Sequence, residues 1–428
     1  MTGGYENRSH KLVFMHLSVI GVPVELSFDG SVPQTLQERI ARSWSRCIAP
    51  DDAPSDAAAA VVIGVALDDN HGLGFPPHRS GTDTSGRPIT WITAQDGPEL
   101  ESQLTVALTL KAIEVQRERL WLFHAAALSD ADGRTIVLAA ASGTGKTTFA
   151  THLGRRFAYV TDETAAVAPD TLAVVPYPKP LSTIVEANRP KTQIGPDELG
   201  LGIPGQALRL VRLALLDRVP GTPMPRAEVM DLGDALLALV PQISYLRSRR
   251  QGLHALADLI RGLGGAVRIV YDNADDVAGI LDGLFDGARE RETAAPVATP
   301  AEPAELGIDD LAVSTSTSPS AMSMDTPGAA AGSGLLTRAP EVCDALRLGP
   351  GERVVLTGPR RLLLDGLGAV LWEALEHPAT TDELFARVLD AMPDAPEGVD
   401  AHAEFEAALQ ALRREGVVTG TGVLQAFA

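Results

Sequence analysis

Residues 135–153 read Thr135-Ile-Val-Leu-Ala-Ala-Ala-Ser-Gly-Thr-Gly-Lys-Thr-Thr-Phe-Ala-Thr-His-Leu153. The apolar run 135–139 predicts a strand, and Phe149 and Leu153 lie one turn apart on the apolar face of a predicted helix. The glycine-rich segment between them, Ala140–Thr147, therefore links a strand to a helix. This is the structural context of a Walker-type phosphate loop.

The residues of this loop have the chemistry needed to bind a nucleoside triphosphate. Gly143 and Gly145 allow backbone conformations in which successive amides point at one anion, and the helix N-terminus adds its dipole. We expect Lys146 to bridge the β- and γ-phosphates of ATP, and Thr147 to place its hydroxyl on Mg²⁺. The expected nucleotide-binding residues are Ala140, Ser142, Gly143, Thr144, Gly145, Lys146, Thr147 and Thr148. Ala140 replaces the usual first glycine, and the alternative is a glycine-rich turn without a ligand.

An acidic pair follows the next predicted strand, Ala158–Thr161. In an open parallel sheet, residues beyond adjacent strand ends share one crevice, so Asp162 and Glu163 are expected to face the loop. Hard oxygen donors suit Mg²⁺, and a free carboxylate can take a proton from a substrate hydroxyl. The expected metal ligands are Thr147, Asp162 and Glu163. The alternative is a solvated acidic turn.

Other polar residues are weaker candidates. His124 stands between apolar neighbours, where a histidine is more often a core residue than a catalyst. Two basic groups could neutralise phosphate charge, although each is also explained as a solvated face: Arg247, Arg249 and Arg250, and Arg189 with Lys191.

The composition restricts the class of protein. A length of 428 residues is enough for two or three domains, and a net charge of −19 argues against a nucleic-acid partner. No apolar run reaches the ~18–20 residues of a membrane span, and the N-terminus lacks the apolar run of a signal peptide. Cys47 and Cys343 form neither a disulfide framework nor a metal site. These features predict a cytoplasmic protein without a nucleic-acid or membrane partner, and they leave a homo-oligomer open.

Four segments are expected along the chain. Residues 1–120 predict an α+β region with strands over 11–28, 61–66 and 89–93 and helices around Leu36 and Leu100. Residues 121–287 hold the phosphate loop. Residues 288–338 are rich in Ala, Pro, Ser, Thr and Gly and predict a disordered linker. Residues 339–428 predict three short strands and three helices, the second opened by a capping box, Thr380-Thr-Asp-Glu383.

Three motifs together resemble the core of the HPr kinase/phosphorylase family: His124-Ala-Ala-Ala127, Ala140–Thr148 and Tyr159-Val-Thr-Asp-Glu163. The loop is also similar to that of ATP-dependent phosphoenolpyruvate carboxykinase. The resemblance extends from about residue 11 to 287 and implies that Asp162 is the catalytic base, that Glu163 binds metal and that His124 is the family histidine. The second acid is Glu and the family's Arg-Pro-Gly-Arg-Asn-type loop is absent, so HPr and the reverse phosphorylase reaction are not implied.

Residues 339–426 resemble PqqD-like proteins, the peptide-recognition modules of pyrroloquinoline quinone biosynthesis. The resemblance implies that a leader peptide adds as a strand near Val354–Leu364, with the third helix as its wall. A generic winged-helix fold is the alternative, and the acidic character of the module disfavours DNA.

The expected fold is therefore α/β and α+β: an HPr kinase/phosphoenolpyruvate carboxykinase-like nucleotide domain, an N-terminal α+β region and a winged-helix-like PqqD module. The expected function is an ATP- and Mg²⁺-dependent kinase for a Ser or Thr hydroxyl of a ribosomally synthesised precursor peptide, with Asp162, Lys146 and His124 as catalytic residues. A kinase for a small metabolite and an ATP-binding peptide chaperone are the alternatives. The acceptor, the nucleotide preference and the role of the N-terminal region are left open.

Overall fold

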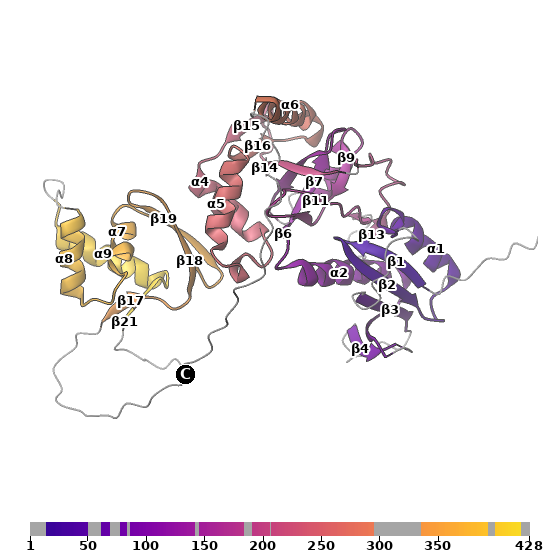
Figure 1. Ribbon diagram of the computed structural model, residues 1–428, viewed down its shortest axis with the longest axis horizontal. Helices are drawn as coiled ribbons and strands as arrows, with labels where there is room; N and C mark the ends of the chain where they lie inside the picture. Colours follow the sequence, from indigo (N-terminus) through magenta and orange to yellow (C-terminus); the bar gives the residue numbers. More distant parts are fainter. Residues whose placement is uncertain are drawn as a thin grey trace, which may run out of the picture. The chain divides into compact units, whose positions relative to one another are not determined.

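The computed structural model describes residues 14–49, 61–68, 78–83, 86–141, 145–183, 191–205, 207–294, 335–392 and 399–420. The chain divides into two compact units, Met1–Ala288 and Arg289–Ala428 (Figure 1). Both combine helices with sheets, so the protein is of mixed α/β class.

The N-terminal region of the first unit is a five-stranded sheet in the order β1-β2-β3-β5-β4. Its strands are β1 (Phe14–Val19), β2 (Val22–Phe28), β3 (Val61–Leu67), β4 (His78–Thr82) and β5 (Pro88–Ala94). Helix α1 (Gln34–Ser43) precedes β3, and the long helix α2 (Gly97–Gln116) packs on the sheet with Leu100, Leu104 and Leu108 fully buried. The strands and both helices predicted for this region are confirmed, except that residues 11–13 lie outside the described residues.

The phosphate-loop region contains a six-stranded sheet in the order β15-β16-β14-β8-β7-β9. Its strands are β7 (Ala125–Ser129), β8 (Arg134–Ala139), β9 (Ala158–Thr161), β14 (Arg209–Arg218), β15 (Arg226–Val229) and β16 (Ala266–Tyr271). Strands β8, β14 and β16 are parallel, whereas β15 and β7 run antiparallel to their neighbours. The sheet is therefore mixed.

One expectation about this sheet is corrected. The sequence predicted that β8 and β9 are adjacent parallel strands, but β7 lies between them and pairs antiparallel with both. The apolar stretch before the loop forms two strands, β6 (Trp121–Phe123) and β7, which are interrupted at His124. Because β7 runs opposite to β8 and β9, its start lies at the same sheet edge as their ends.

Helix α3 (Lys146–Leu153), which follows the loop, shares one buried cluster with the sheet and with α6 (Ala278–Ala294). Phe149 and Leu153 of α3 and Phe285 of α6 pack there against sheet residues such as Leu138 and Ile269. Helices α4 (Leu232–Leu239) and α5 (Gly252–Gly262) complete this region. Apolar packing thus fixes the helix whose N-terminus carries Lys146.

Short strands join the two regions of the first unit. Strands β6, β10 (Ala165–Val167) and β11 (Val174–Val175) form one small sheet, and β12 (Leu181–Thr183) pairs with β13 (Thr192–Ile194). Leu122, Ala166 and Tyr177 belong to the same buried cluster as the apolar residues of α1 and α2. The N-terminal region and the phosphate-loop region therefore share a core.

The second unit is a small α+β module. Strands β18 (Val342–Gly349), β19 (Glu352–Thr357) and β20 (Arg360–Asp365) form an antiparallel sheet, and β17 (Leu336–Arg338) pairs with β21 (Val418–Gly420). Helices α7 (Gly366–Ala374), α8 (Thr381–Ala391) and α9 (Ala401–Arg414) follow. The predicted capping box at Thr380 and Glu383 is confirmed, with both of its hydrogen bonds formed.

Ordered structure reaches further into the predicted linker than composition indicated. Helix α6 extends to Ala294 and β17 begins at Leu336, so both ends of the range 288–338 carry regular structure. The apolar side chain of Leu336 explains the second case, since it is buried in the core of the C-terminal module. Residues 295–334 lie outside the described residues.

Candidate functional site

Three predicted segments meet at one edge of the six-stranded sheet. The end of β8 leads into the loop, the end of β9 leads into Asp162 and Glu163, and the start of β7 follows His124. The clearest contact is between Thr147 on α3 and Asp162, because the Thr147 Oγ1 donates a hydrogen bond of 2.8 Å to Asp162 Oδ2. Two residues that the sequence proposed as metal ligands are therefore in direct contact.

Lys146 opens helix α3 and is buried. Its N-terminal neighbour Gly145 has φ of 91°, a left-handed conformation that glycine adopts without strain. The Lys146 ammonium donates to the carbonyl oxygens of Ala140 at 2.9 Å and Ala141 at 3.4 Å. Burial lowers the pKa of Lys146, and the carboxylates of Glu163 and Asp162 partly oppose that shift.

Asp162 is 3% exposed and its two oxygens serve different neighbours. Oδ2 accepts the bond from Thr147, whereas Oδ1 accepts one from the Tyr159 hydroxyl at 2.9 Å and lies 2.9 Å from Lys179 Nζ. Burial, together with the nearby Asp162 charge, raises the pKa of Tyr159 well above its usual range. Tyr159 is therefore a neutral hydrogen-bond donor to this carboxylate.

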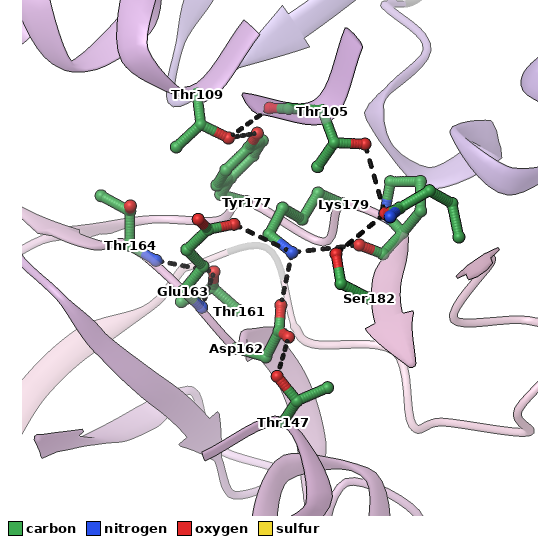
Figure 2. A network of polar contacts seen from close by, with 12 residues as sticks. Thr105, Thr109, Thr147, Thr161, Asp162, Glu163, Thr164, Tyr177, Lys179 and Ser182 are labelled. Carbon is green, nitrogen blue, oxygen red and sulfur yellow. Dashed lines mark hydrogen bonds and ion pairs between the residues drawn. The ribbon is translucent and has the colours of Figure 1, made fainter. Parts of the chain in front are cut away.

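Lys179 is the main residue that the sequence reasoning missed. Its side chain is 1% exposed, and its ammonium contacts Asp162 and, at 3.1 Å, Glu163 Oε2 (Figure 2). Burial alone would lower the pKa of Lys179, but the two carboxylates outweigh it and the pKa is raised. The sequence contains a signal that could have pointed to Lys179. The chain has only five lysines, and this one lies between two prolines in Pro176-Tyr-Pro-Lys-Pro180.

The segment that carries Lys179 is tied to helix α2. The Tyr177 and Thr109 hydroxyls lie 2.7 Å apart and share a hydrogen bond. Gln193 Oε1 accepts bonds from Ser182 at 3.0 Å and from Thr105 of α2 at 3.3 Å. Figure 2 shows these contacts near those that Lys179 makes with the acids.

Glu163 and His124 form the accessible side of the site. The Glu163 side chain is 34% exposed, and its carbonyl oxygen accepts a hydrogen bond of 3.0 Å from the amide of Ala125. This bond places His124, the preceding residue, beside the acids. The His124 side chain is exposed, yet partial loss of hydration, and next the Lys146 charge, lower its pKa. His124 is therefore neutral at pH 7.

The other residues predicted for the site lie at the end of β8, at the start of α3 or outside the described residues. Ala140 is buried at the end of β8, and Thr148 is exposed in the first turn of α3. Ser142, Gly143 and Thr144 lie outside the described residues, as does Arg189. Arg249 stacks 4.5 Å from the Trp121 ring centre and donates to the Leu120 carbonyl, so its role is structural. Arg247, Arg250 and Lys191 are exposed.

The donor set suits a magnesium ion that is shared with a nucleotide. No group of three His, Cys, Asp or Glu side chains within the described ranges is arranged to hold a metal by itself. A hydroxyl and a carboxylate oxygen in contact are hard donors, and Mg²⁺ is usually bound by one or two such protein ligands together with water and phosphate oxygens. Thr147 and Asp162 Oδ2 fit that pattern.

The fold and the site define a mixed α/β protein in which a lysine, a threonine and two acids meet at one sheet edge. No family model matches the chain, and no curated protein matches it. Among solved structures, the chain is similar to the Hpr(Ser) kinase/phosphatase from Coxiella burnetii, with 11% identity and a TM-score of 0.20 over 40% of this chain and 99% of that chain. A likeness of this extent does not assign a reaction, which has to be argued from the residues.

The helices give no sign of a membrane span. Within the described ranges, none is both long enough and apolar enough to cross a bilayer.

Proposed function

We propose that the first unit is an ATP-dependent kinase that phosphorylates a Ser or Thr hydroxyl of a ribosomally synthesised precursor peptide. The observation that carries this proposal is the 2.8 Å contact between Thr147 and Asp162, next to a lysine at the N-terminus of α3. A hydroxyl from the loop and an acid from a nearby strand end form the usual magnesium pair of phosphate-loop enzymes. The sequence resemblance of the three motifs supports phosphoryl transfer.

The geometry favours Glu163, rather than Asp162, as the group that takes the hydroxyl proton. A general base must come within about 2.6–3.2 Å of the acceptor. The Asp162 side chain is 2% exposed and three donors surround it, whereas the Glu163 side chain is 34% exposed. This reverses the roles that the resemblance implied.

In the proposed reaction the bond between the γ-phosphorus and the ADP oxygen breaks and a bond to the acceptor oxygen forms. The acceptor proton passes to Glu163. Lys146 stabilises the negative charge on the transferring phosphoryl group, and Thr147 with Asp162 Oδ2 orients the metal site. Magnesium, when bound with the nucleotide, neutralises phosphate charge. Neutral His124 can donate one hydrogen bond at the rim of the site.

The second unit is proposed to capture the leader segment of the peptide. Strand β19, which includes Val354–Leu356, pairs on both sides, so within the expected region only the edge strand β20 can accept another strand. An ion pair of 3.1 Å between Arg360 and Glu415 joins β20 to the residue that follows α9. Tethering through this edge would raise the effective acceptor concentration at the kinase site.

The test is a reaction with magnesium-ATP and a peptide encoded beside the gene, followed by mass spectrometry. The proposal requires a gain of one phosphate on a Ser or Thr. It also requires that Glu163→Gln reduces turnover at least tenfold while Glu198→Gln, a control at an exposed residue that follows β13, does not. A leaderless peptide should need at least ~100-fold higher concentration. Peptide binding without phosphorylation would favour a chaperone, and no binding would favour a metabolite kinase.

A further inference from the structure

Lys179 is a buried cation to which the proposed chemistry assigns no part. Its ammonium meets three acceptors: Asp162 Oδ1 at 2.9 Å, Glu163 Oε2 at 3.1 Å and the Pro180 carbonyl at 3.0 Å. A lysine ammonium has three N–H donors, so these contacts use all of them. Lys179 has no donor for a phosphate and can influence transfer only through the two acids.

The contacts of Lys179 determine how Asp162 is oriented. A carboxylate oxygen has about two acceptor sites. Oδ1 fills both with Tyr159 and Lys179, while Oδ2 accepts only the Thr147 bond among the hydrogen bonds described. Rotation of the carboxylate would break all of these contacts. One oxygen is therefore kept toward the phosphate loop with an acceptor site for a metal.

The same ammonium restrains Glu163. The side chain is partly exposed, and an exposed glutamate ordinarily samples several rotamers. The contact of 3.1 Å to Oε2 ties one oxygen to Lys179, while the side chain as a whole stays 34% exposed. A base that is tied in this way spends more of its time within reach of an acceptor hydroxyl.

The position of Lys179 is in turn fixed from helix α2. Pro178 and Pro180 flank it and restrict the backbone, and Tyr177 is fully buried with its hydroxyl bonded to Thr109 of α2. The segment Tyr177–Pro180, which carries the lysine, is thus held in place by helix α2 of the N-terminal region.

We infer that Lys179 is a positioning residue: an internal cation, supported by α2 through Tyr177, that holds Asp162 and Glu163 in the orientation needed for phosphoryl transfer. The inference rests on the proposed kinase function for its effect on turnover. Its effect on cation binding does not depend on transfer. The acids and Lys179 carry a net charge of −1, which becomes −2 when the lysine is replaced by an uncharged residue of similar length.

The experiment compares Lys179→Met with the wild-type full chain and with Lys111→Met, a matched control on the exposed face of α2. Manganese binding without nucleotide is measured by electron paramagnetic resonance, and ATP binding and turnover are measured separately. We expect Lys179→Met to lower turnover at least ~10-fold because Glu163 loses its restraint. Asp162 keeps its contacts with Tyr159 and Thr147, so the affinity for Mn²⁺ should rise roughly tenfold because one positive charge is gone. The control should change neither quantity by more than twofold.

The outcomes distinguish failure of the proposed kinase function from failure of the positioning role of Lys179. If the wild-type chain binds neither Mn²⁺ nor ATP, the proposed function fails. If it binds both and transfers phosphate, but Lys179→Met keeps wild-type turnover, the positioning role is overturned. A merely structural lysine would lower turnover and Mn²⁺ affinity together, because a disordered site binds no ion well.

A second variant decides the question if Lys179→Met does not fold. Tyr177→Phe removes only the hydroxyl that contacts Thr109 and keeps the lysine charge. Loss of one hydrogen bond in the support of Lys179 should lower turnover about 3- to 10-fold with Mn²⁺ affinity unchanged. Wild-type turnover in Tyr177→Phe would overturn the link to α2 and with it the inference.

Discussion

Replacing Asp162 with Asn tests whether this carboxylate supports both the fold and the site. The Asp162–Lys179 contact is 2.9 Å long between side chains that are 2% and 1% exposed, respectively. Removing one partner of a buried pair costs about 3–5 kcal/mol, but Lys179 retains Glu163, so we expect about 3 kcal/mol. In a unit of this size that lowers the melting temperature by roughly 5–10 °C.

An asparagine has a single acceptor oxygen, so it cannot satisfy both the Thr147 side and the Lys179 side. We therefore also expect the affinity for magnesium-ATP to fall at least tenfold, with little change in affinity for ATP in excess chelator. The assays are thermal unfolding by circular dichroism and titration calorimetry. Asp282→Asn, which breaks an exposed ion pair with Arg156, is the control. A melting temperature within 1 °C of wild type and an unchanged magnesium dependence would refute the reasoning.

Cys47, His124 and Gly133 allow three further tests. Burial raises the pKa of Cys47 from about 9 to about 12, so the folded state holds this proton more tightly; its stabilising effect is complete below pH 9 and is lost as pH rises toward 12. In urea unfolding, the loss of stability between pH 9 and 10.5 should be about 2 kcal/mol larger in the wild-type chain than in Cys47→Ala. The pKa of His124, measured by proton NMR, should lie below 6.5 and should rise in Lys146→Met, because the lysine charge is one cause of the depression; no change in that variant would contradict the assignment. Gly133→Ala should destabilise the first unit by more than 1 kcal/mol in the same urea assay, because φ is 82° and a Cβ would lie 2.0 Å from the Ala207 carbonyl oxygen, whereas Gly221→Ala, also at positive φ but in open space, should cost less.

The features that were predictable from sequence are those set by neighbouring residues. The strand before the loop, helix α3 and the capping box at Thr380 depend on local periodicity and on side chains three or four residues apart. The pairing order of the sheet could not be obtained in this way. An alanine-rich run such as Ala125–Ala127 is compatible with a parallel or an antiparallel partner, so the position of β7 depends on the fold as a whole.

The candidate site was predictable to a similar extent. Thr147 and Asp162 follow recognisable elements, and the structure brings them together. Lys179 lies 17 residues beyond Asp162, after two short strands, and only tertiary packing turns it toward the acids. A lysine between prolines usually occupies the surface, so neither propensity nor spacing predicted a fully buried ammonium.

The core shared by Leu122, Ala166 and Tyr177 with helices α1 and α2 has a practical consequence for anyone who divides this chain. A fragment that begins at Trp121 would retain every residue of the proposed reaction but would lose helix α2, which supports Tyr177 and Lys179. Its freshly exposed aromatic and aliphatic surface would favour aggregation during expression. The absence of activity in a fragment of that kind would therefore not test the proposed phosphoryl transfer. Activity measurements on this protein have to start from the intact first unit.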